Sequence, residues 1–426
     1  MKPAGYGRDS RLRIEGGRRL EGTVRVSGAK NASLPMMVAA LLSSEETTLE
    51  NVPGIDDTVV MAMILRHLGA TVTRDPELPD VYRLSGRGVW RTEAPSRLVT
   101  SLRASFVVMG ALLGRFGEAA CAAPGGDVIG QRPLDVHLAG FAALGAEITR
   151  EGDKFVARAP TLRGARVFMD YPSVLGTENI LLAAVLARGH TRIVNAAAEP
   201  EIVSLAEMLN KMGARIEGSG SHTIEVDGVE SLGGTHHRVI PDRIEAGTFA
   251  LAAALTEGDV AIEDAVPCHL EALTSKMGDM GVQVEEYECG LRITRCGRLK
   301  ATQVQAVPYP GLATDMQAPL AVLLTQAHGV SFVHERVYDN RFLYLGELRK
   351  FGAEMVQAGS TAVISGPTPL VGASVRALDV RAGAALVLAA LAAQGETEIS
   401  DVFHLDRGYE NLDGKLTKLG AAIHRV

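Results

Sequence analysis

The phrase Leu68-Gly69-Ala70-Thr71-Val72 decides the fold, because close variants of it return along the chain. The later copies begin Leu144-Gly145-Ala146, Met212-Gly213-Ala214, Met280-Gly281-Val282, Phe351-Gly352-Ala353 and Leu419-Gly420-Ala421. In each copy an apolar residue closes a helix, the glycine suits the left-handed position after it, and alternating residues then start a strand. The sequence therefore predicts six repeated units of about 70 residues.

A second phrase precedes most of these copies: an Ala/Leu-rich helix, a short polar turn and a β-branched strand. The strands expected from it cover residues 47–51, 191–195, 260–264 and 397–401. The helices before them carry small apolar residues on more than one face, which predicts that they are buried centrally. Together the two phrases predict an α/β protein built from six βαβαββ units.

Six units of this size favour two domains of three units over an open solenoid. We expect the cut near Arg238 to Arg243, with residues 24–27 and 239–240 as the connecting strands. Domain one would then comprise residues 1–29 and 241–426, and domain two residues 30–240. A cleft between two such domains is the default place for a ligand.

The composition excludes several classes of protein. The chain has 426 residues, a net charge of −7, 4% aromatic residues and one Trp, which argues against binding to nucleic acid. Residues 382–393, the longest apolar run, are far shorter than the roughly 20 residues of a membrane span. Residues 1–17 lack the apolar core of a signal peptide. The four cysteines lack the spacing of metal ligands, so we expect reduced thiols in a cytoplasmic protein.

The stretch from Pro124 to His137 is the first candidate for chemistry. Its Pro-Gly-Gly opening breaks regular structure and lets backbone N–H groups approach an anion. Asp127, Arg132 and Asp135 then offer an acid, a guanidinium group and an acceptor carboxylate in one short segment. Alone, such a stretch is more often a polar surface loop. Matching charged segments elsewhere in the repeat favour a site.

These segments stand at helix entries and turns of successive repeats, where the repeat would gather them at one end of each domain. A helix N-terminus beside a lysine binds anions, and guanidinium groups suit phosphate and carboxylate oxygens. Asp315, near a helix start, is a cap, a partner of the helix dipole or a general base. His137 and His404 receive supporting roles, because no metal-type spacing accompanies them. The charged residues of these segments are Lys30, Arg103, Arg243, Asp315, Arg341, Arg381 and Arg407.

Taken together, the phrases resemble the UDP-N-acetylglucosamine enolpyruvyl transferases (1-carboxyvinyltransferases), from about Leu12 to Arg425. The resemblance rests on residues 27–31, 103–105, 132–135, 314–317, 340–342 and 406–410. It implies two inside-out α/β barrels that close around phosphoenolpyruvate and a sugar nucleotide to make a peptidoglycan precursor. It implies neither a metal nor an organic cofactor.

The resemblance also implies roles for individual residues. Asp315 would take the proton of the acceptor 3′-hydroxyl, and Asp127 would protonate C3 of phosphoenolpyruvate, with Lys30 and Arg407 completing the catalytic set. The phosphoenolpyruvate-binding residues would be Lys30, Asn31, Arg132, Arg341, Arg381 and Arg407. The sugar-nucleotide site would comprise Arg103, Arg132, Pro133, Leu134, Asp135, Val136, Ser173, Val174, Asp315 and Val337.

Two departures from the family pattern carry expectations of their own. Many members have a cysteine in place of Asp127 that fosfomycin alkylates, and a carboxylate is a weaker nucleophile, so we expect resistance to the drug. Leu175 interrupts the usual Ser-Val-Gly-Ala-Thr phrase and leaves another nucleotide acceptor as an alternative. A silent nucleotide-binding sensor is the second alternative, but retention of Lys30, Arg132, Asp315 and Arg407 counts against it. The sequence does not predict the oligomeric state.

Overall fold

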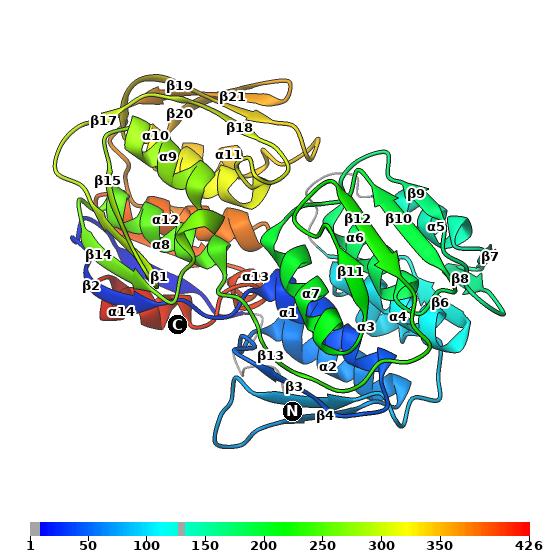
Figure 1. The fold of residues 1–426 in the computed structure, drawn as a ribbon. Helices are drawn as coiled ribbons and strands as arrows, with labels where there is room; N and C mark the ends of the chain where they lie inside the picture. The colour runs from blue at the N-terminus through cyan, green and yellow to red at the C-terminus, as the bar shows by residue number, and fades with distance from the viewer. Residues whose placement is uncertain (1–8, 127–132) are drawn as a thin grey trace. The chain divides into compact units, whose positions relative to one another are not determined.

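The computed structural model describes residues 9–126 and 133–426 (Figure 1). These residues divide into two compact units. Unit 1 comprises residues 9–27 and 241–426, and unit 2 comprises residues 28–126 and 133–240. The described chain thus passes between the units after Ser27 and after Ile240.

The sheets of unit 1 repeat one arrangement. The first strand of each sheet runs parallel to the second, which pairs with one of two further strands that are antiparallel to each other. In one sheet these two strands, β1 (Leu12–Glu15) and β24 (Ala422–Arg425), come from opposite ends of the chain. The middle sheet also contains β18 (Gln303–Ala306), which pairs with β19. In the described part of unit 1 the sheets are β2 (Glu21–Arg25)–β14 (Asp259–Glu263)–β16 (Gly290–Thr294)–β15 (Gln283–Tyr287), β17 (Leu299–Lys300)–β19 (Ala327–Glu335)–β21 (Thr361–Gly366)–β20 (Glu354–Ala358), and β22 (Ser374–Arg376)–β23 (Glu396–Ser400)–β1 (Leu12–Glu15)–β24 (Ala422–Arg425).

Unit 2 follows the same plan with one reduced sheet. There the first strand is reduced to a single bridge between Glu93 and Ala120, because a helix begins at Ser96 and ends the extended chain. The described sheets of unit 2 are β13 (His236–Arg238)–β3 (Thr47–Glu50)–β5 (Tyr82–Ser85)–β4 (Thr71–Arg74), β9 (Arg166–Phe168)–β10 (His190–Val194)–β12 (Thr223–Asp227)–β11 (Arg215–Glu217), and β6 (Glu118–Ala122)–β8 (Lys154–Arg158)–β7 (Glu147–Glu151).

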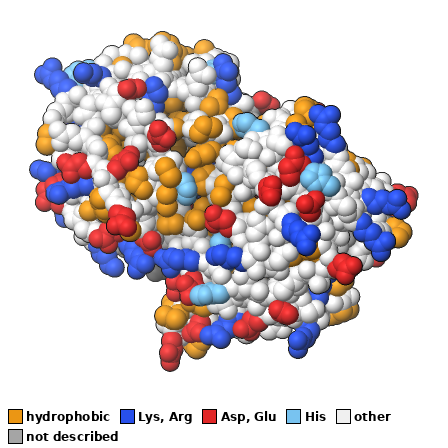
Figure 2. Space-filling view, viewed as in Figure 1, with side chains coloured by type: hydrophobic (Ala, Val, Ile, Leu, Met, Phe, Trp, Pro, Cys, Tyr) orange, Lys and Arg blue, Asp and Glu red, His pale blue; other side chains and the backbone are white. Residues whose placement is uncertain are grey.

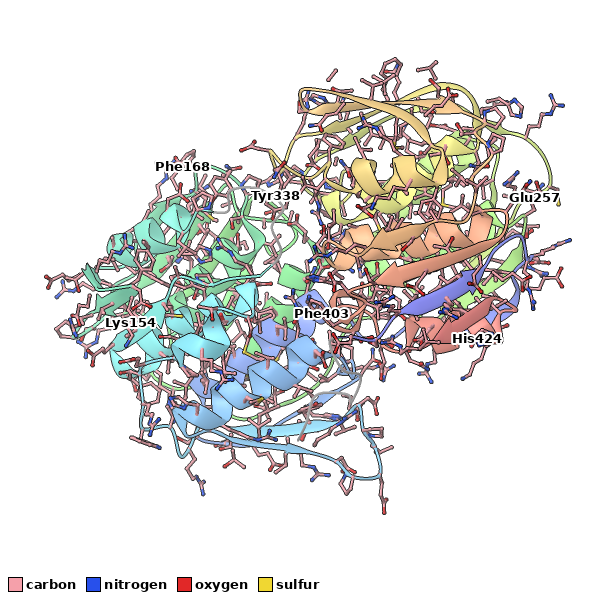
Figure 3. All side chains as sticks on the ribbon, turned by 180° about the vertical axis from the view of Figure 1, so that it is seen from behind. Lys154, Phe168, Glu257, Tyr338, Phe403 and His424 are labelled. Carbon is pink, nitrogen blue, oxygen red and sulfur yellow. The ribbon has the colours of Figure 1, made fainter. Side chains whose placement is uncertain are left out.

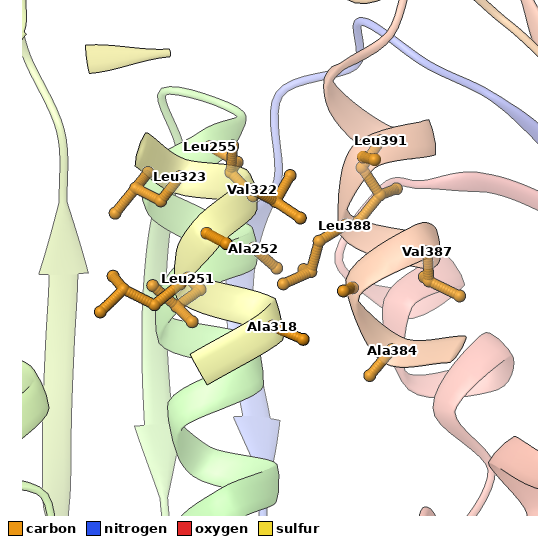
Figure 4. Close-up of a cluster of buried hydrophobic side chains, with 14 of the residues drawn as sticks. Leu251, Ala252, Leu255, Ala318, Val322, Leu323, Ala384, Val387, Leu388 and Leu391 are labelled. Atoms are coloured by element: carbon orange, nitrogen blue, oxygen red, sulfur yellow. The ribbon is translucent and has the colours of Figure 1, made fainter. Parts of the chain in front are cut away.

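The central helices are buried, as the sequence predicted. In unit 1 these are α8 (Arg243–Leu255), α10 (Gln317–Thr325) and α12 (Val380–Ala392), and every residue of α10 is buried. Their Ala, Val and Leu side chains face one another in the core (Figure 4). Unit 2 buries α1 (Lys30–Ala39), α4 (Val108–Phe116) and α6 (Val174–Ala184) in the same way. Helices inside and sheets outside confirm the predicted inside-out α/β barrel.

Other helices connect the second strand of each repeat to the antiparallel strands that follow it. In the described residues they are α2 (Asp56–Leu68), α5 (Asp135–Ala143), α7 (Pro200–Lys211), α9 (Glu271–Asp279), α11 (Tyr344–Leu348) and α14 (Leu412–Lys418), besides the short α3 (Ser96–Val99) and α13 (Phe403–Asp406). None of the described helices combines the length and apolar character that crossing a membrane requires. Acidic and basic side chains are interspersed over the face drawn in Figure 2.

The repeat is visible in the backbone. The six phrase glycines, predicted to be left-handed, have φ between +92° and +106°: Gly69, Gly145, Gly213, Gly281, Gly352 and Gly420. Four strands also end on a left-handed Asx residue, which sequence reasoning missed: Asn51, Asn195, Asp264 and Asp401, with φ of 55° to 60°. Asn51 and Asn195 each donate from Nδ2 to a carbonyl just beyond the neighbouring parallel strand, at 2.9 Å and 2.8 Å. These side chains stabilise the junction at which each strand pair ends.

Candidate functional site

The charged centre of unit 1 is Asp315, which lies between two buried guanidinium groups. Arg341 Nη2 donates to Asp315 Oδ1 at 2.7 Å, and Arg381 Nε donates to Oδ2 at 2.9 Å. Both arginine side chains are 6% exposed, whereas that of Asp315 is 24% exposed. The carboxylate makes no capping bond to a backbone N–H. The interpretation of Asp315 as a helix cap is therefore wrong, and the base interpretation stays open.

A further acidic residue supports each arginine, one through the backbone and one through Thr314. Asp379 caps α12, where its Oδ1 accepts from the N–H groups of Arg381 and Ala382 at 2.8 Å and 2.9 Å. Arg341 Nη1 donates to Thr314 Oγ1 at 2.9 Å, and this hydroxyl donates to Glu335 at 2.6 Å. These contacts fix the backbone at Arg381 and the guanidinium group of Arg341.

Glu335 also orders the predicted nucleotide residue Val337. Its Oε1 accepts from the N–H groups of Val337 and Tyr338 at 2.7 Å and 3.3 Å. Tyr338 and Phe403, both labelled in Figure 3, lie in the segments that carry Arg341 and Arg407. Unit 1 thus brings Asp315, Arg341, Arg381 and Val337 together. Sequence reasoning assigned no role to Glu335 or Thr314, nor to Asp379 as the cap of α12.

The electrostatics of this centre favour an ionised Asp315. Burial alone would raise the pKa of Asp315, but the adjacent Arg381 and Arg341 outweigh it and hold the pKa well below its usual range. The pKa of Arg381 rises in turn, because Asp315 outweighs the effect of burial. The two guanidinium groups stay charged beside Asp315 and offer N–H donors of the kind that bind an anionic ligand.

Arg407 directly follows the short α13. The preceding residue, Asp406, is bound by Arg425 through Nη1 and Nη2 at 2.9 Å and 2.8 Å. Arg425 Nε also donates to Asp413 at 3.1 Å. This paired contact fixes the chain beside Arg407, and sequence reasoning missed it.

In unit 2, Lys30 begins α1 and Asn31 follows it. Lys30 Nζ lies 2.5 Å from Asp57 Oδ2, a carboxylate at the start of α2 whose side chain is only 3% exposed. Gly28 is required just before them, because a Cβ there would come within 1.6 Å of the Asn51 carbonyl oxygen. Close packing against Asn51 therefore explains a glycine two residues before Lys30. Asp57 is a partner that sequence reasoning missed.

A second group in unit 2 comes from the starts of α5 and α6. Ser173 caps α6, since its Oγ accepts from the N–H of Gly176 at 3.1 Å. Asp135 Oδ1 accepts from its neighbour Val136 N–H at 2.8 Å and from the Tyr171 hydroxyl at 3.0 Å. Val136 in turn lies close to Gly176, where an added Cβ would meet its Cγ2 at 2.9 Å. Asp135, Val136 and Ser173 are thus brought together, whereas Leu175 packs partly buried against the core of unit 2.

His137 ties this group to the segment of Arg103, which opens the turn leading into α4. The His137 ring packs edge-on against Phe106, with centroids 5.3 Å apart, and its Nδ1 lies 3.0 Å from Asn179 Nδ2. Asn179 also donates to the Phe106 carbonyl at 2.9 Å and accepts from Gly110 N–H at 2.6 Å. Burial, together with nearby Arg103, lowers the pKa of His137 to about 3. The ring is therefore a neutral structural group.

Two predicted residues, Asp127 and Arg132, lie outside the described residues. Pro133 and Leu134 are described and lead directly into α5. Within the described ranges, no group of three or more His, Cys, Asp or Glu side chains is arranged to hold a metal ion.

Comparison with known proteins extends over nearly the whole chain. Residues 14–416 match the EPSP synthase (3-phosphoshikimate 1-carboxyvinyltransferase) family. UDP-N-acetylglucosamine 1-carboxyvinyltransferase 1 of Caldanaerobacter subterraneus subsp. tengcongensis is 48% identical over 95% of this chain and 97% of its own. The chain belongs to the carboxyvinyltransferase family. The UDP-N-acetylglucosamine 1-carboxyvinyltransferase of Desulfosudis oleivorans is 47% identical over 98% of this chain and 99% of its own.

Solved structures of carboxyvinyltransferases show the same architecture. The enolpyruvyl transferase NikO from Streptomyces tendae has a TM-score of 0.88 at 28% identity and covers 98% of this chain and 99% of its own. EPSP synthase from Acinetobacter baumannii has a TM-score of 0.75 at 18% identity over 98% of this chain and 100% of its own, which shows the fold alone. The resemblance stated from the sequence and the predicted fold class are confirmed.

The neutral His137 predicts a specific dependence of stability on pH. An unfolded chain protonates this histidine as the pH falls through about 6.5, whereas the folded protein does so only near 3. Acid therefore favours the unfolded state between these values, by about 2 kcal/mol from pH 7 to pH 5. Denaturant unfolding should show that His137→Gln is closer to the wild type in stability at pH 5 than at pH 7, by this amount.

The exposed His328 provides the matched control, because His328→Gln removes an imidazole without opening the core. A stability difference between His137→Gln and the wild type that is equal at both pH values would contradict a neutral His137.

Proposed function

We propose that the protein transfers the enolpyruvyl group of phosphoenolpyruvate to the 3′-hydroxyl of UDP-N-acetylglucosamine and releases phosphate. The observation that carries the proposal is Asp315 between Arg341 and Arg381, in a chain 48% identical to a protein named for this acceptor. We place the reaction in peptidoglycan precursor synthesis in the cytoplasm. The alternative nucleotide acceptor receives less support, because the relatives named for UDP-N-acetylglucosamine are 46% to 48% identical over nearly the whole chain.

The proposed reaction proceeds by addition and elimination. The acceptor oxygen bonds to C2 of phosphoenolpyruvate while C3 takes up a proton, which gives a tetrahedral ketal. The C2–O bond to phosphate then breaks, C3 loses a proton, and the double bond forms again. Phosphate leaves with the bridging oxygen, so atoms and charge balance without a redox step. Neither step requires a metal or an organic cofactor.

Asp315 would receive the proton of the acceptor hydroxyl. Its lowered pKa makes it a weak base in the resting site, and each carboxylate oxygen keeps a lone pair beyond its arginine contact. The proton would therefore move only as the new C2–O bond forms and the hydroxyl becomes acidic. Arg341 and Arg381 would hold the carboxylate oriented through the reaction.

The anionic substrate requires cations that are already in place. Lys30, Arg132 and Arg407 would bind the phosphate and carboxylate of phosphoenolpyruvate, with Asn31 beside them and Arg341 and Arg381 adding positive charge. Lys30 is held by buried Asp57, so little ordering of the ammonium group is needed when the phosphate arrives. Asp127 would supply the proton to C3.

The acceptor would be held mainly by unit 2. Arg103, Pro133, Leu134, Asp135, Val136, Ser173 and Val174 would line the nucleotide subsite, together with Arg132, Asp315 and Val337. The capped start of α6 offers backbone N–H groups to a diphosphate. The proposal thus requires groups of both units to act on one pair of substrates.

Replacing Asp315 tests the proposed role directly. Asp315→Asn keeps the size of the side chain but removes the charge that orders Arg341 and Arg381. We expect phosphate release from phosphoenolpyruvate and UDP-N-acetylglucosamine to fall at least about 1,000-fold. Nucleotide binding by titration calorimetry should change less than about tenfold, because most of its proposed contacts lie elsewhere.

Asp279→Asn, on the exposed surface of α9, is the matched control and should keep wild-type turnover. Near-normal turnover of Asp315→Asn would remove Asp315 from the reaction. Absence of phosphate release by the wild type would remove the proposed acceptor or the proposed reaction.

The carboxylate at position 127 predicts insensitivity to fosfomycin. Wild-type phosphate release should persist after incubation with the drug, because a carboxylate opens an epoxide far more slowly than a thiolate does. Asp127→Cys should lose activity progressively under the same conditions. Rapid stoichiometric inactivation of the wild type would contradict this account of position 127.

A further inference from the structure

Ser27 is the last residue of unit 1 before the chain enters unit 2, and all its polar groups are bound within unit 1. Its N–H donates to Glu245 Oε2 at 2.9 Å. Its carbonyl accepts from Asp242 N–H at 2.9 Å, and its hydroxyl accepts from Lys415 Nζ at 2.7 Å. The chain therefore leaves unit 1 from a fully bonded residue.

The start of α8 supplies most of these contacts through an opened capping box. Asp242 caps α8, accepting at Oδ1 from Ile244 N–H at 2.8 Å and from Glu245 N–H at 3.1 Å. In an ordinary capping box the glutamate at the third helical position would bind the cap residue's own N–H. Here Ser27 lies between the two residues. Its carbonyl accepts from the Asp242 N–H, and its N–H donates to Glu245.

Lys415 of α14 closes the arrangement. Its Nζ lies 2.5 Å from Glu245 Oε1, and the two side chains are only 16% and 3% exposed. Burial raises the pKa of Glu245 to about 7, against the effect of Lys415. Such a buried pair is seldom better for overall stability than apolar residues of the same volume. The Glu245–Lys415 pair therefore matters more for the position of Ser27 than for the stability of the fold.

The same residues border the charged centre of unit 1. Asp242 is close enough to Arg381 to raise the pKa of that guanidinium group, and Arg381 donates to Asp315. The other charged groups that act on Glu245 are Lys415 and Asp242 itself. Ser27, in turn, precedes Lys30 by three residues. One short network thus joins Ser27, where the chain leaves unit 1, to Arg381 and Asp315.

Within unit 2 the two connecting segments are also bonded. Ala29 N–H donates to the Ile240 carbonyl at 2.7 Å, and Asn51 Nδ2 donates to the Val239 carbonyl at 2.9 Å. In unit 1 the corresponding bond joins Asp242 to Ser27. Each unit therefore binds both segments at which the chain passes between the units. In unit 1 the Glu245–Lys415 pair binds Ser27, and we call this pair the anchor.

We propose that Glu245 and Lys415 are positioning residues: they fix Ser27, and with it the direction in which the chain leaves unit 1 toward Lys30. The inference rests on the proposed function, in which Lys30 and Asp315 act on the same substrates. If Ser27 lost these hydrogen bonds, both units would stay folded, but Lys30 and Asp315 would act together on the substrates less often. Turnover should then fall, while nucleotide binding to unit 2 remains.

The anchor itself is tested by hydrogen exchange on the full chain, independently of activity. Lys415→Met removes both bonds of Nζ, and the Ser27 and Asp242 amides should exchange at least about tenfold faster. Ser27→Ala removes one bond only and serves if Lys415→Met does not fold. Lys418→Met, on the exposed side of the same helix, is the control and should leave both amides unchanged. Unchanged exchange in Ser27→Ala and in any folded Lys415→Met overturns the anchor.

Steady-state kinetics test the positioning role. Lys415→Met should lower kcat at least about tenfold and change the KM for UDP-N-acetylglucosamine less than about threefold, and Lys415→Arg should recover part of the loss. Faster exchange with wild-type kcat, or an equal loss in Lys418→Met, overturns the role in catalysis. If the wild type itself releases no phosphate, the proposed function and the catalytic role fail together, and the exchange result still decides whether the anchor exists.

Discussion

One carboxylate between two buried guanidinium groups organises the chemistry of this protein. Asp315 joins the turn before α10 to Arg341 and to the first turn of α12. Without Asp315, two cations would face each other in a site largely removed from water, which is costly. With Asp315 in place, both guanidinium groups are ordered before an anion arrives. The supporting bonds of Thr314, Glu335 and Asp379 all hold this centre.

The repeat explains why such a centre can form. Each unit buries three helices, and the residues of interest stand at helix starts, where unpaired N–H groups and positive dipole ends favour anions. In unit 1 these starts carry Asp242, Asp315 and Arg381, and the contacts among them show that the three starts meet. In unit 2 the corresponding starts carry Lys30, Arg103 and Ser173. Repetition of one supersecondary unit thus gathers residues that are far apart in the sequence.

Much of the fold could be predicted because its signals are local. The phrase glycines, the alternating strands and the apolar helices each reflect a backbone or burial requirement of neighbouring residues, and the structure confirms them. The reduced first strand before β6 was not predicted, because it depends on where the next helix begins. The left-handed Asn51 and Asn195 were missed because each depends on a carbonyl of a distant strand.

The candidate site was only partly predictable, since its bonds join distant elements. The resemblance named Asp315, Arg341 and Arg381, but their pairing spans 26 and 66 residues. Glu245 and Lys415, which are 170 residues apart, belong to no common motif. Asp57 reads from the sequence as an ordinary acidic residue in the first turn of a helix, and only the structure places it on Lys30. Local pattern predicts where helices begin, whereas the partner of each charged side chain follows from tertiary packing.

The central claim, transfer of an enolpyruvyl group, is tested most directly by following the bridging oxygen of phosphoenolpyruvate. Phosphoenolpyruvate labelled with oxygen-18 between C2 and phosphorus should be incubated with UDP-N-acetylglucosamine, and both products analysed by mass spectrometry. Because the account breaks the C2–O bond, it predicts that the label leaves with phosphate and is absent from the nucleotide product. Label retained on the carbon product would mean that the P–O bond breaks, and would contradict enolpyruvyl transfer.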